Sequence, residues 1–282
     1  MFETLDSVVR STKNIGFWMG VPRRIRGYEP RVQLKIQKST YEIRTVSTRK
    51  EFQQILSLRY AIFEREFRGN WIPFGWDADE YDFLGDHLVI EDLNTGRIVG
   101  TYRLICSRFS NVFYTASEFE LDSFLATPGV KLELGRACIH PRYRNGAVMG
   151  LLWRGVMEYA RQVQATHLFG CASIKTLDPR IVKLLQDDFN ARHALYPDEA
   201  VRPNEDYQAV DPTRFALDAR GEAKDYLPPL LKSYLKAGAQ VACEPAYDRY
   251  FRCVDFFTVL DLSSVSPLYG KRFIGNQIDP EK

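Results

Sequence analysis

The chain has 282 residues, of which 45% are hydrophobic and 26% are charged, and its formal net charge is +2. This composition is typical of a soluble globular protein and excludes an intrinsically disordered chain. The net charge says little about partners, and we expect no nucleic-acid partner. No apolar stretch reaches the roughly 18 residues of a membrane-spanning helix. The length favours one elaborated domain.

The cysteines carry information about the compartment. Their number is odd, they form no CxxC pair, and they lie mostly among apolar neighbours at positions 106, 138, 171, 243 and 253. This pattern favours buried free thiols in a reducing environment over a disulfide or metal framework. The N-terminal segment lacks the basic start and apolar core of a secretory signal. We therefore expect a cytoplasmic protein.

Residues 1–40 are predicted to form a basic extension. Between residues 21 and 38 there is one acid, Glu29, and six basic side chains: Arg23, Arg24, Arg26, Arg31, Lys35 and Lys38. Such a cluster favours an anionic membrane surface, where each basic residue contributes roughly 1 kcal/mol, and would place the protein peripherally on the inner membrane. The alternative is a solvated arm packed on the domain.

An α/β domain is predicted over residues 41–270, followed by a tail at 271–282. Its elements are a strand at 41–46, a helix at 48–67, a long loop at 68–86, hairpin strands at 87–92 and 97–106, a strand, loop and helix over 132–162, a strand at 166–173, a helix from 178, an insertion or lid at 190–226, a helix at 228–238, and closing strands at 239–248 and 255–262. Their hydrophobic periods are those of strands and helices. The element order indicates a mixed central sheet flanked by helices.

Three helix ends carry local signals. Thr48 and Glu51 have the spacing of a capping box. Asp178 is a helix cap followed by Pro179 in the first turn. Gly238 marks the end of the late helix.

Two charged residues, Glu133 and Arg136, interrupt the apolar strand KLELGRACI. In a regular strand their odd spacing would place them on opposite faces. Burying a charge is costly unless it is paired or hydrogen-bonded, and a glycine inside a strand often marks a bulge. We therefore predict a bulge at Leu134–Gly135 that turns both side chains to one face and splays the strand. A structural ion pair at a strand edge fits the sequence equally well.

The same strand runs into PRYRNGA, which places Arg142, Arg144 and Gly146 just before a helix. Free N–H groups at a helix N-terminus, together with the helix dipole, favour a phosphate group there. Many strand-to-helix junctions contain arginine and glycine, so the motif by itself favours a structural junction.

The loop segment DADEYD contains three acids, Asp77, Asp79 and Asp82. They could hold a cationic amine. A solvated acidic loop and a cation site are the alternatives, although the full EF-hand ligand pattern is absent. No histidine and cysteine cluster indicates a metal, and neither GxSxG nor GxxxxGK[ST] is present, which argues against a serine hydrolase and a nucleoside-triphosphate loop.

The combination of LRYAIFEREF, DADEYD, GTYRL and ELGR resembles one branch of the GNAT acyltransferase superfamily. It is similar to the pattern shared by acyl-homoserine-lactone synthases and long-chain N-acyl amino acid synthases. The segments LELGRACIHPRYRNGA and LPPLLKSYLKAGAQVACEPAYD resemble the ornithine lipid N-acyltransferase, or hemolysin-like, group. The resemblance covers residues 41–270 and implies a GNAT-like mixed sheet with a bulged, splayed strand.

This resemblance implies transfer of a long-chain 3-hydroxyacyl group from acyl carrier protein to an amino acid, with ornithine giving a lyso-ornithine lipid. Arg142, Arg144, Gly146 and Ala147 would hold the phosphopantetheine arm, which enters as substrate, so no cofactor is expected. The usual GNAT loop pattern, Gln/Arg-x-x-Gly-x-Gly/Ala, is not met in register, because Arg142 precedes Asn145 instead of a glycine. This departure favours a carrier protein over free coenzyme A.

The resemblance also implies roles for the charged residues. Glu133 and Arg136 match the catalytic-strand pair, with Glu133 as general base, directly or through a water. Backbone N–H groups beside the bulge would stabilise the oxyanion. Arg103 and Arg136 would hold carboxylates of the substrate or of the loop. The remaining members of the substrate-binding cluster would bind a side-chain amine such as that of ornithine; they are Asp77, Asp79 and Asp82.

A direct transfer needs no covalent intermediate, and no cysteine is expected to serve as a nucleophile. Two other functions stay open from the sequence. One is an N-acyl amino acid or acyl-homoserine-lactone-type signal synthase. The other is a non-catalytic acyl-carrier or membrane-binding module.

Overall fold

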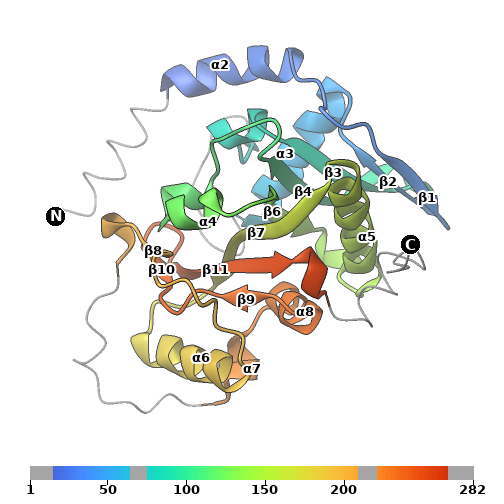
Figure 1. The fold of residues 1–282 in the computed structure, drawn as a ribbon. Coiled ribbons are helices and arrows are strands. Elements are labelled where there is room, and N and C mark those ends of the chain that lie inside the picture. Colours follow the sequence, from blue (N-terminus) through green and yellow to red (C-terminus); the bar gives the residue numbers. More distant parts are fainter. Residues whose placement is uncertain (1–14, 64–74, 209–220, 266–282) are drawn as a thin grey trace, which may run out of the picture.

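The computed structural model of the chain describes residues 15–63, 75–208 and 221–265. Within these ranges nine strands form one central sheet (Figure 1). They are β1 (Lys35–Lys38), β2 (Tyr41–Thr45), β3 (Asp86–Asp92), β4 (Arg97–Cys106), β6 (Val130–Ile139), β7 (Ala165–Ile174), β9 (Gln240–Val241), β10 (Ala246–Asp248) and β11 (Cys253–Asp261). Their order is β1-β2-β3-β4-β6-β7-β11-β10, with β9 beside β11. All of these pairings are antiparallel except that of β6 with β7, so the predicted mixed sheet is confirmed.

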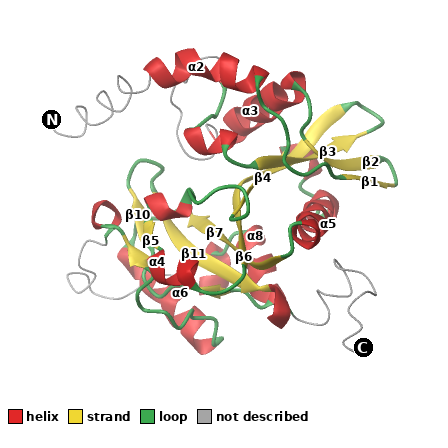
Figure 2. Cartoon of the chain, turned by 45° about the horizontal axis from the view of Figure 1, so that its top comes forward, coloured by secondary structure: helices red, strands yellow, loops and turns green. Residues whose placement is uncertain are grey.

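Helices cover the sheet (Figure 2). They are α2 (Ile15–Arg26), α3 (Arg49–Phe63), α4 (Asp122–Ala126), α5 (Ala147–Gln162), α6 (Pro179–Ala191), α7 (Ala223–Tyr226) and α8 (Pro229–Ala237), with the 3-10 helices η3 (Glu80–Phe83), η4 (Thr115–Ser117), η5 (Pro141–Tyr143), η6 (Glu205–Tyr207) and η8 (Leu262–Ser264). The short strands β5 (Phe119–Glu120) and β8 (Arg202–Pro203) pair with each other. The predicted caps at Thr48, Asp178 and Gly238 are confirmed.

The alternation of side chains along β3 accounts for two packing layers. Leu88 and Ile90 share a core cluster with Leu152 of α5. Val89, between them, belongs to a different cluster with Phe52 of α3. Because neighbouring residues of a strand point to opposite faces, α3 and α5 cover opposite sides of the sheet.

The first helix and strand belong to the folded domain. Val21 and Ile25 of α2 are buried in the α3 cluster, and β1 pairs with β2, so the expected boundary at residue 40 falls inside a pair of strands. Arginines interrupt the hydrophobic spacing of α2, which is why the sequence did not predict a helix. Contact of residues 21–38 with a membrane stays a prediction. None of the helices in the described ranges is long and apolar enough to cross a bilayer.

Several predictions lie wholly or partly outside the described residues. They are positions 1–14 of the predicted extension, the end of the first predicted helix after residue 63, positions 68–74 of the predicted loop, positions 209–220 of the predicted insertion, the last residues of the predicted domain at 266–270, and the tail at 271–282. The described parts of the insertion contain β8, η6 and α7.

The predicted irregularity of β6 exists, but it lies at Arg136–Ala137 and not at Leu134–Gly135. Gly135 pairs in register with Arg103 of β4, and the next pair joins Cys138 to Thr101. Two residues of β6 therefore stand opposite one residue of β4, which is the definition of a bulge.

The bulge brings two charged side chains to one face of the sheet. Arg136 has a left-handed backbone with a φ of 53°, and its guanidinium meets Asp79, as does that of Arg103. Gly135 does not form the predicted bulge but leaves space for a neighbouring side chain. A Cβ at this position would lie 3.4 Å from Nη2 of Arg103. The missing side chain therefore makes room for that guanidinium. Glu133 lies two residues before Gly135 in the regular part of β6, so its side chain lies on the same face of the sheet as that of Arg103, which pairs with Gly135.

The two parallel strands separate after their first few residues. β6 and β7 pair from Val130 to Glu133, opposite Ala165 to Phe169, and their register ends there. Beyond this point each strand has an edge that faces the other without pairing, so the predicted splay is confirmed.

Gly170 lies where the strands separate, and its replacement by alanine is expected to destabilise the protein by about 1–3 kcal/mol. A Cβ at this position would lie 2.3 Å from the carbonyl oxygen of Leu134, a backbone atom that cannot rotate away. Urea unfolding measures the loss. Gly20→Ala is the matched control, because a Cβ there meets nothing within 4 Å and alanine favours a helix. Equal stability of the two variants would contradict the steric account.

Candidate functional site

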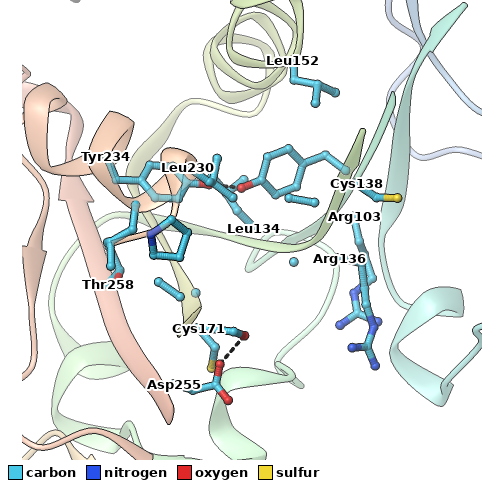
Figure 3. A pocket seen from close by; sticks show the side chains of 18 of the residues that line it. Arg103, Leu134, Arg136, Cys138, Leu152, Cys171, Leu230, Tyr234, Asp255 and Thr258 are labelled. Atoms are coloured by element: carbon cyan, nitrogen blue, oxygen red, sulfur yellow. Dashed lines mark hydrogen bonds between the residues drawn. The ribbon is translucent and has the colours of Figure 1, made fainter. Parts of the chain in front are cut away.

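A cavity of about 470 Å³ lies where β6 and β7 separate. Residues 134–139 of β6 and 168–173 of β7 line it, and α8 contributes Leu230 and Tyr234 (Figure 3). The wall is mainly apolar, which suits a hydrocarbon chain. Among its polar groups, Arg103 and Arg136 lie together on one side and Asp255 lies with Cys171 on another.

Glu133 presents a buried carboxylate to this cavity. Its Oε1 accepts the backbone N–H of Thr115 at 2.6 Å, and its Oε2 accepts that of Tyr114 at 3.0 Å. Burial raises the pKa of Glu133 above its ordinary value, although Arg103 and the two amides act in the opposite direction. Each oxygen keeps a second lone pair, so the carboxylate can accept a proton from a bound group.

Arg103 and Arg136 share carboxylates of the acidic loop. Nη1 of Arg103 donates to Asp79 at 2.6 Å and to Asp82 at 3.2 Å, and Nη2 of Arg136 donates to Asp79 at 2.8 Å. The Arg136 guanidinium also lies 5.2 Å from the ring centre of Tyr114. The sequence predicted that these arginines hold carboxylates either of the substrate or of the acidic loop, and the structure shows them bound to the carboxylates of the loop.

Sequence reasoning missed Arg59, which completes this network from α3. Its Nη1 and Nη2 donate to Asp82 at 2.7 and 3.1 Å, and its Nε donates to Asp77 at 2.8 Å. Arg59 has no exposed surface. Its position follows Phe52 and Leu56 at helical spacing, so a charge on the apolar face was the signal that could have identified it.

The three loop acids are therefore matched by three arginines. Burial acts to raise the pKa of Asp77, but Arg136 and Arg59 outweigh it and hold the pKa below its ordinary value. The pKa of Asp79 is lowered in the same way, with Arg103 as the strongest opposing charge. The segment is a buried ion-pair network and not a solvated loop, and it has no free charge for the predicted amine.

The predicted donor loop lies at the edge of the cavity. Gly146 takes a left-handed φ of 87° just before α5, and both Gly146 and Arg144 line the cavity. Arg142 and Ala147 are not among the lining residues. The N–H of Ala147 donates to the side chain of Asn145 at 3.1 Å.

Three cysteines line the cavity, namely Cys138, Cys171 and Cys253. Burial raises the pKa of Cys171 and of Cys253, so both remain thiols and are poor nucleophiles. All five cysteines are free. The expectation of buried thiols is confirmed for Cys106, Cys138 and Cys253, whereas Cys171 is half-buried and Cys243 is exposed.

A second group of acids lies beside the cavity and was not predicted. Glu118, Asp248 and Asp255 are buried, and one ligand atom of each lies within 4.8 Å of the others. Asp255 accepts hydrogen bonds from Ser173 and Cys253. No arginine or lysine of the described ranges forms an ion pair with the three, which come from distant parts of the chain and share no motif.

The free energy of unfolding is expected to fall as the pH rises from about 4 to 6. Burial, with Asp248 nearby, raises the pKa of Asp255 from 3.8 to about 6. The folded state therefore holds a proton in this window that the unfolded state has lost, so stability is full below the window and is lost by up to about 3 kcal/mol across it. Urea unfolding at several pH values measures this loss. In Asp255→Asn the loss should be smaller, and an unchanged profile would contradict the assignment.

Comparison with known proteins supplies a family. Residues 58–154 match the family described as "Acetyltransferase (GNAT) domain". The L-ornithine N(alpha)-acyltransferase of Rhodobacter capsulatus is 35% identical over 243 residues, which are 80% of this chain and 92% of that protein. The L-ornithine N(alpha)-acyltransferase of Agrobacterium fabrum is 33% identical over 248 residues, which are 82% and 84% of the two chains.

Solved structures with a similar arrangement include two synthases. The AHL synthase LasI matches with a TM-score of 0.48 and 12% identity, over 86% of this chain and 96% of that chain. The N-acyl amino acid synthase FeeM, from uncultured soil microbes, matches with a TM-score of 0.45 and 8% identity, over 80% and 94% of the two chains.

Proposed function

The chain belongs to the family of the L-ornithine N(alpha)-acyltransferases, within the GNAT acyltransferases, and on this basis we propose that it acylates the α-amine of ornithine. The donor is a long-chain 3-hydroxyacyl group on acyl carrier protein, and the product is a lyso-ornithine lipid. The observation that supports this best is the apolar cavity between the separated strands, with the carboxylate of Glu133 in its wall.

The reaction needs one proton acceptor and one oxyanion site. The α-ammonium gives a proton to Glu133, and the neutral nitrogen attacks the thioester carbon. Backbone N–H groups of β6 beyond Glu133, which β7 does not pair, stabilise the tetrahedral oxyanion. The C–S bond then breaks, the departing thiolate takes the second amine proton, and Glu133 returns its proton to water.

Arg136 orients the acceptor in this proposal. Its buried Nε lies 3.7 Å from Oδ2 of Asp77, an ion pair without a hydrogen bond, and has no hydrogen-bond partner among the described residues. Arg136 lies on the same face as Glu133. A carboxylate is the group that an arginine donor binds best. The α-carboxylate of the amino acid therefore lies against Arg136, with the neighbouring α-amine directed to Glu133.

The donor arm enters between the strands from the side of α5. Arg144 and Gly146 line the cavity next to the first turn of α5, where free amides favour a phosphate. The apolar wall takes the acyl chain, and the thioester lies near Glu133.

Incubation of the pure protein with 3-hydroxyacyl carrier protein and a panel of amino acids, followed by mass spectrometry, tests the function. The expected result is one amide product, with ornithine, and slower turnover with the corresponding acyl-coenzyme A. No amide with any amine would refute acyl transfer, and a faster reaction with coenzyme A would refute the carrier protein as donor.

A further inference from the structure

The acids Glu118, Asp248 and Asp255 form a pocket of negative charge that the proposed reaction does not use. Asp248 accepts the backbone N–H groups of Tyr250 and Phe251, both at 2.8 Å. Asp255 lines the cavity, and one carboxylate oxygen each of Asp248 and Glu118 lies within 4.8 Å of a carboxylate oxygen of Asp255. Three carboxylates in one buried place repel each other unless they are protonated or a cation joins them.

Glu118 is the observation that points to a ligand. Only 1% of its surface is exposed, and neither of its carboxylate oxygens has a hydrogen-bond partner among the described residues. The hydroxyl of Tyr114 and the thiol of Cys171 lie nearby, and burial, together with the charge of Asp255, raises the pKa of Glu118 well above its ordinary value. A buried carboxylate without partners is strongly unfavourable, so Glu118 is held as the neutral acid until a cationic group from outside the chain displaces its proton.

A single 3-10 turn joins this pocket to the general base. The N–H groups of Tyr114 and Thr115 bind Glu133, and η4 then leads to Glu118, whose N–H donates to the carbonyl of Thr115 at 3.1 Å. With about 2 Å of rise per residue, the backbone of Glu118 lies about 6 Å along this turn from that of Thr115.

We propose that Glu118, Asp248 and Asp255 bind the distal ammonium group of a diamino acid acceptor and thereby make the enzyme specific for ornithine. This assignment rests on the proposed function. An ammonium offers three N–H donors to the three carboxylates, while Arg136 holds the α-carboxylate and Glu133 meets the α-amine. The distal amine is thereby kept away from the thioester, which explains why only the α-nitrogen is acylated.

A metal ion is the competing occupant. Magnesium and calcium take six or more oxygen ligands and retain water or carbonyl groups. In the described residues the pocket offers three carboxylates, and Asp255 already accepts bonds from Ser173 and Cys253. This ligand set is small for either metal and suits an ammonium.

The test compares ornithine with norvaline, which has the same carbon chain without the distal amine. The wild-type protein should prefer ornithine by at least about 100-fold in kcat/KM, because a site built for a donor rejects an analogue without it. In Glu118→Gln this preference should fall below about 10-fold. Glu120→Gln, two residues away on β5 and exposed, is the matched control and should keep the preference.

Binding provides a second measurement that does not depend on turnover. Ornithine, but not norvaline, should raise the unfolding temperature of the wild-type protein, and the shift should disappear in Glu118→Gln. Asp255→Asn repeats both measurements if Glu118→Gln fails to fold. An unchanged preference in both variants would overturn the site.

Two further outcomes separate the competing explanations. Calorimetric titration with magnesium, calcium or manganese chloride alone should show no binding that depends on Glu118, and such binding would overturn the ammonium assignment in favour of a metal. If ornithine and norvaline are acylated equally well, the pocket is refuted while acyl transfer stands. If neither is acylated by the wild-type protein, the proposed function itself fails.

Discussion

Glu133→Gln is expected to slow acyl transfer by about 100- to 10,000-fold, the usual contribution of a general base. The amide has the same shape as the carboxylate but cannot take a proton from the ammonium. One of the N–H groups of Tyr114 and Thr115 would also face an amide nitrogen, at a cost of about 1–3 kcal/mol in stability. Initial rates and unfolding curves of the same preparation separate the two effects.

The pH–rate profile distinguishes a base from a merely structural residue. The rate of the wild-type protein should rise with pH through the raised pKa of Glu133 and then level off. The rate of Glu133→Gln should continue to rise with pH up to the pKa of the substrate amine, because without the base only the unprotonated amine can react. Glu120→Gln should follow the wild-type profile, and binding of the acyl carrier protein should be unchanged in all three proteins. A parallel profile of Glu133→Gln would falsify its role as base.

Asp82→Asn is expected to lower the free energy of unfolding by about 3–5 kcal/mol, the range found when one partner of a buried ion pair is removed. Asp82 has no exposed surface and accepts bonds from Arg59, Arg103 and the N–H of Asp79. The amide leaves Arg59 buried beside a neutral group. Guanidinium unfolding at pH 7 measures the change.

An exposed ion pair supplies the control for this measurement. Asp187 pairs with Lys183 one turn away on α6, and both side chains are exposed to about one half. Asp187→Asn should therefore change stability by less than about 1 kcal/mol. If Asp82→Asn were no more destabilising than this variant, the ion-pair network would not stabilise the fold.

The fold could be predicted largely from the sequence because its main elements obey local rules. The hairpin of β3 and β4, the capped helices α3 and α6, and the strand β7 follow hydrophobic period and capping chemistry. The helix α2 could not be predicted from the sequence, because it has no continuous apolar stripe and its burial depends on contact with α3. The splay of β6 was predicted from two charges in one strand.

The position of the bulge shows where local rules end. Glycine is the usual residue for an irregular strand, yet the left-handed residue is Arg136, whose strain is tolerated because Asp77 and Asp79 hold its guanidinium. The contact between Arg136 and these two acids cannot be predicted from the sequence, because the acids lie far from Arg136 along the chain. The same limit applies to Arg59 and to Glu118, whose neighbours in space are far away in the chain.

The buried arginines also determine the order in which the chain can assemble. Their carboxylate partners lie 18 to 57 residues away in the sequence, and contacts of this kind form late in folding. If the apolar layers closed first, Arg59 and Arg103 would be enclosed without a counter-charge, which is strongly unfavourable. The core can therefore close only after the acidic loop has arrived, so a molecule that has completed its core has also fixed the guanidinium of Arg136 beside Asp77 and Asp79.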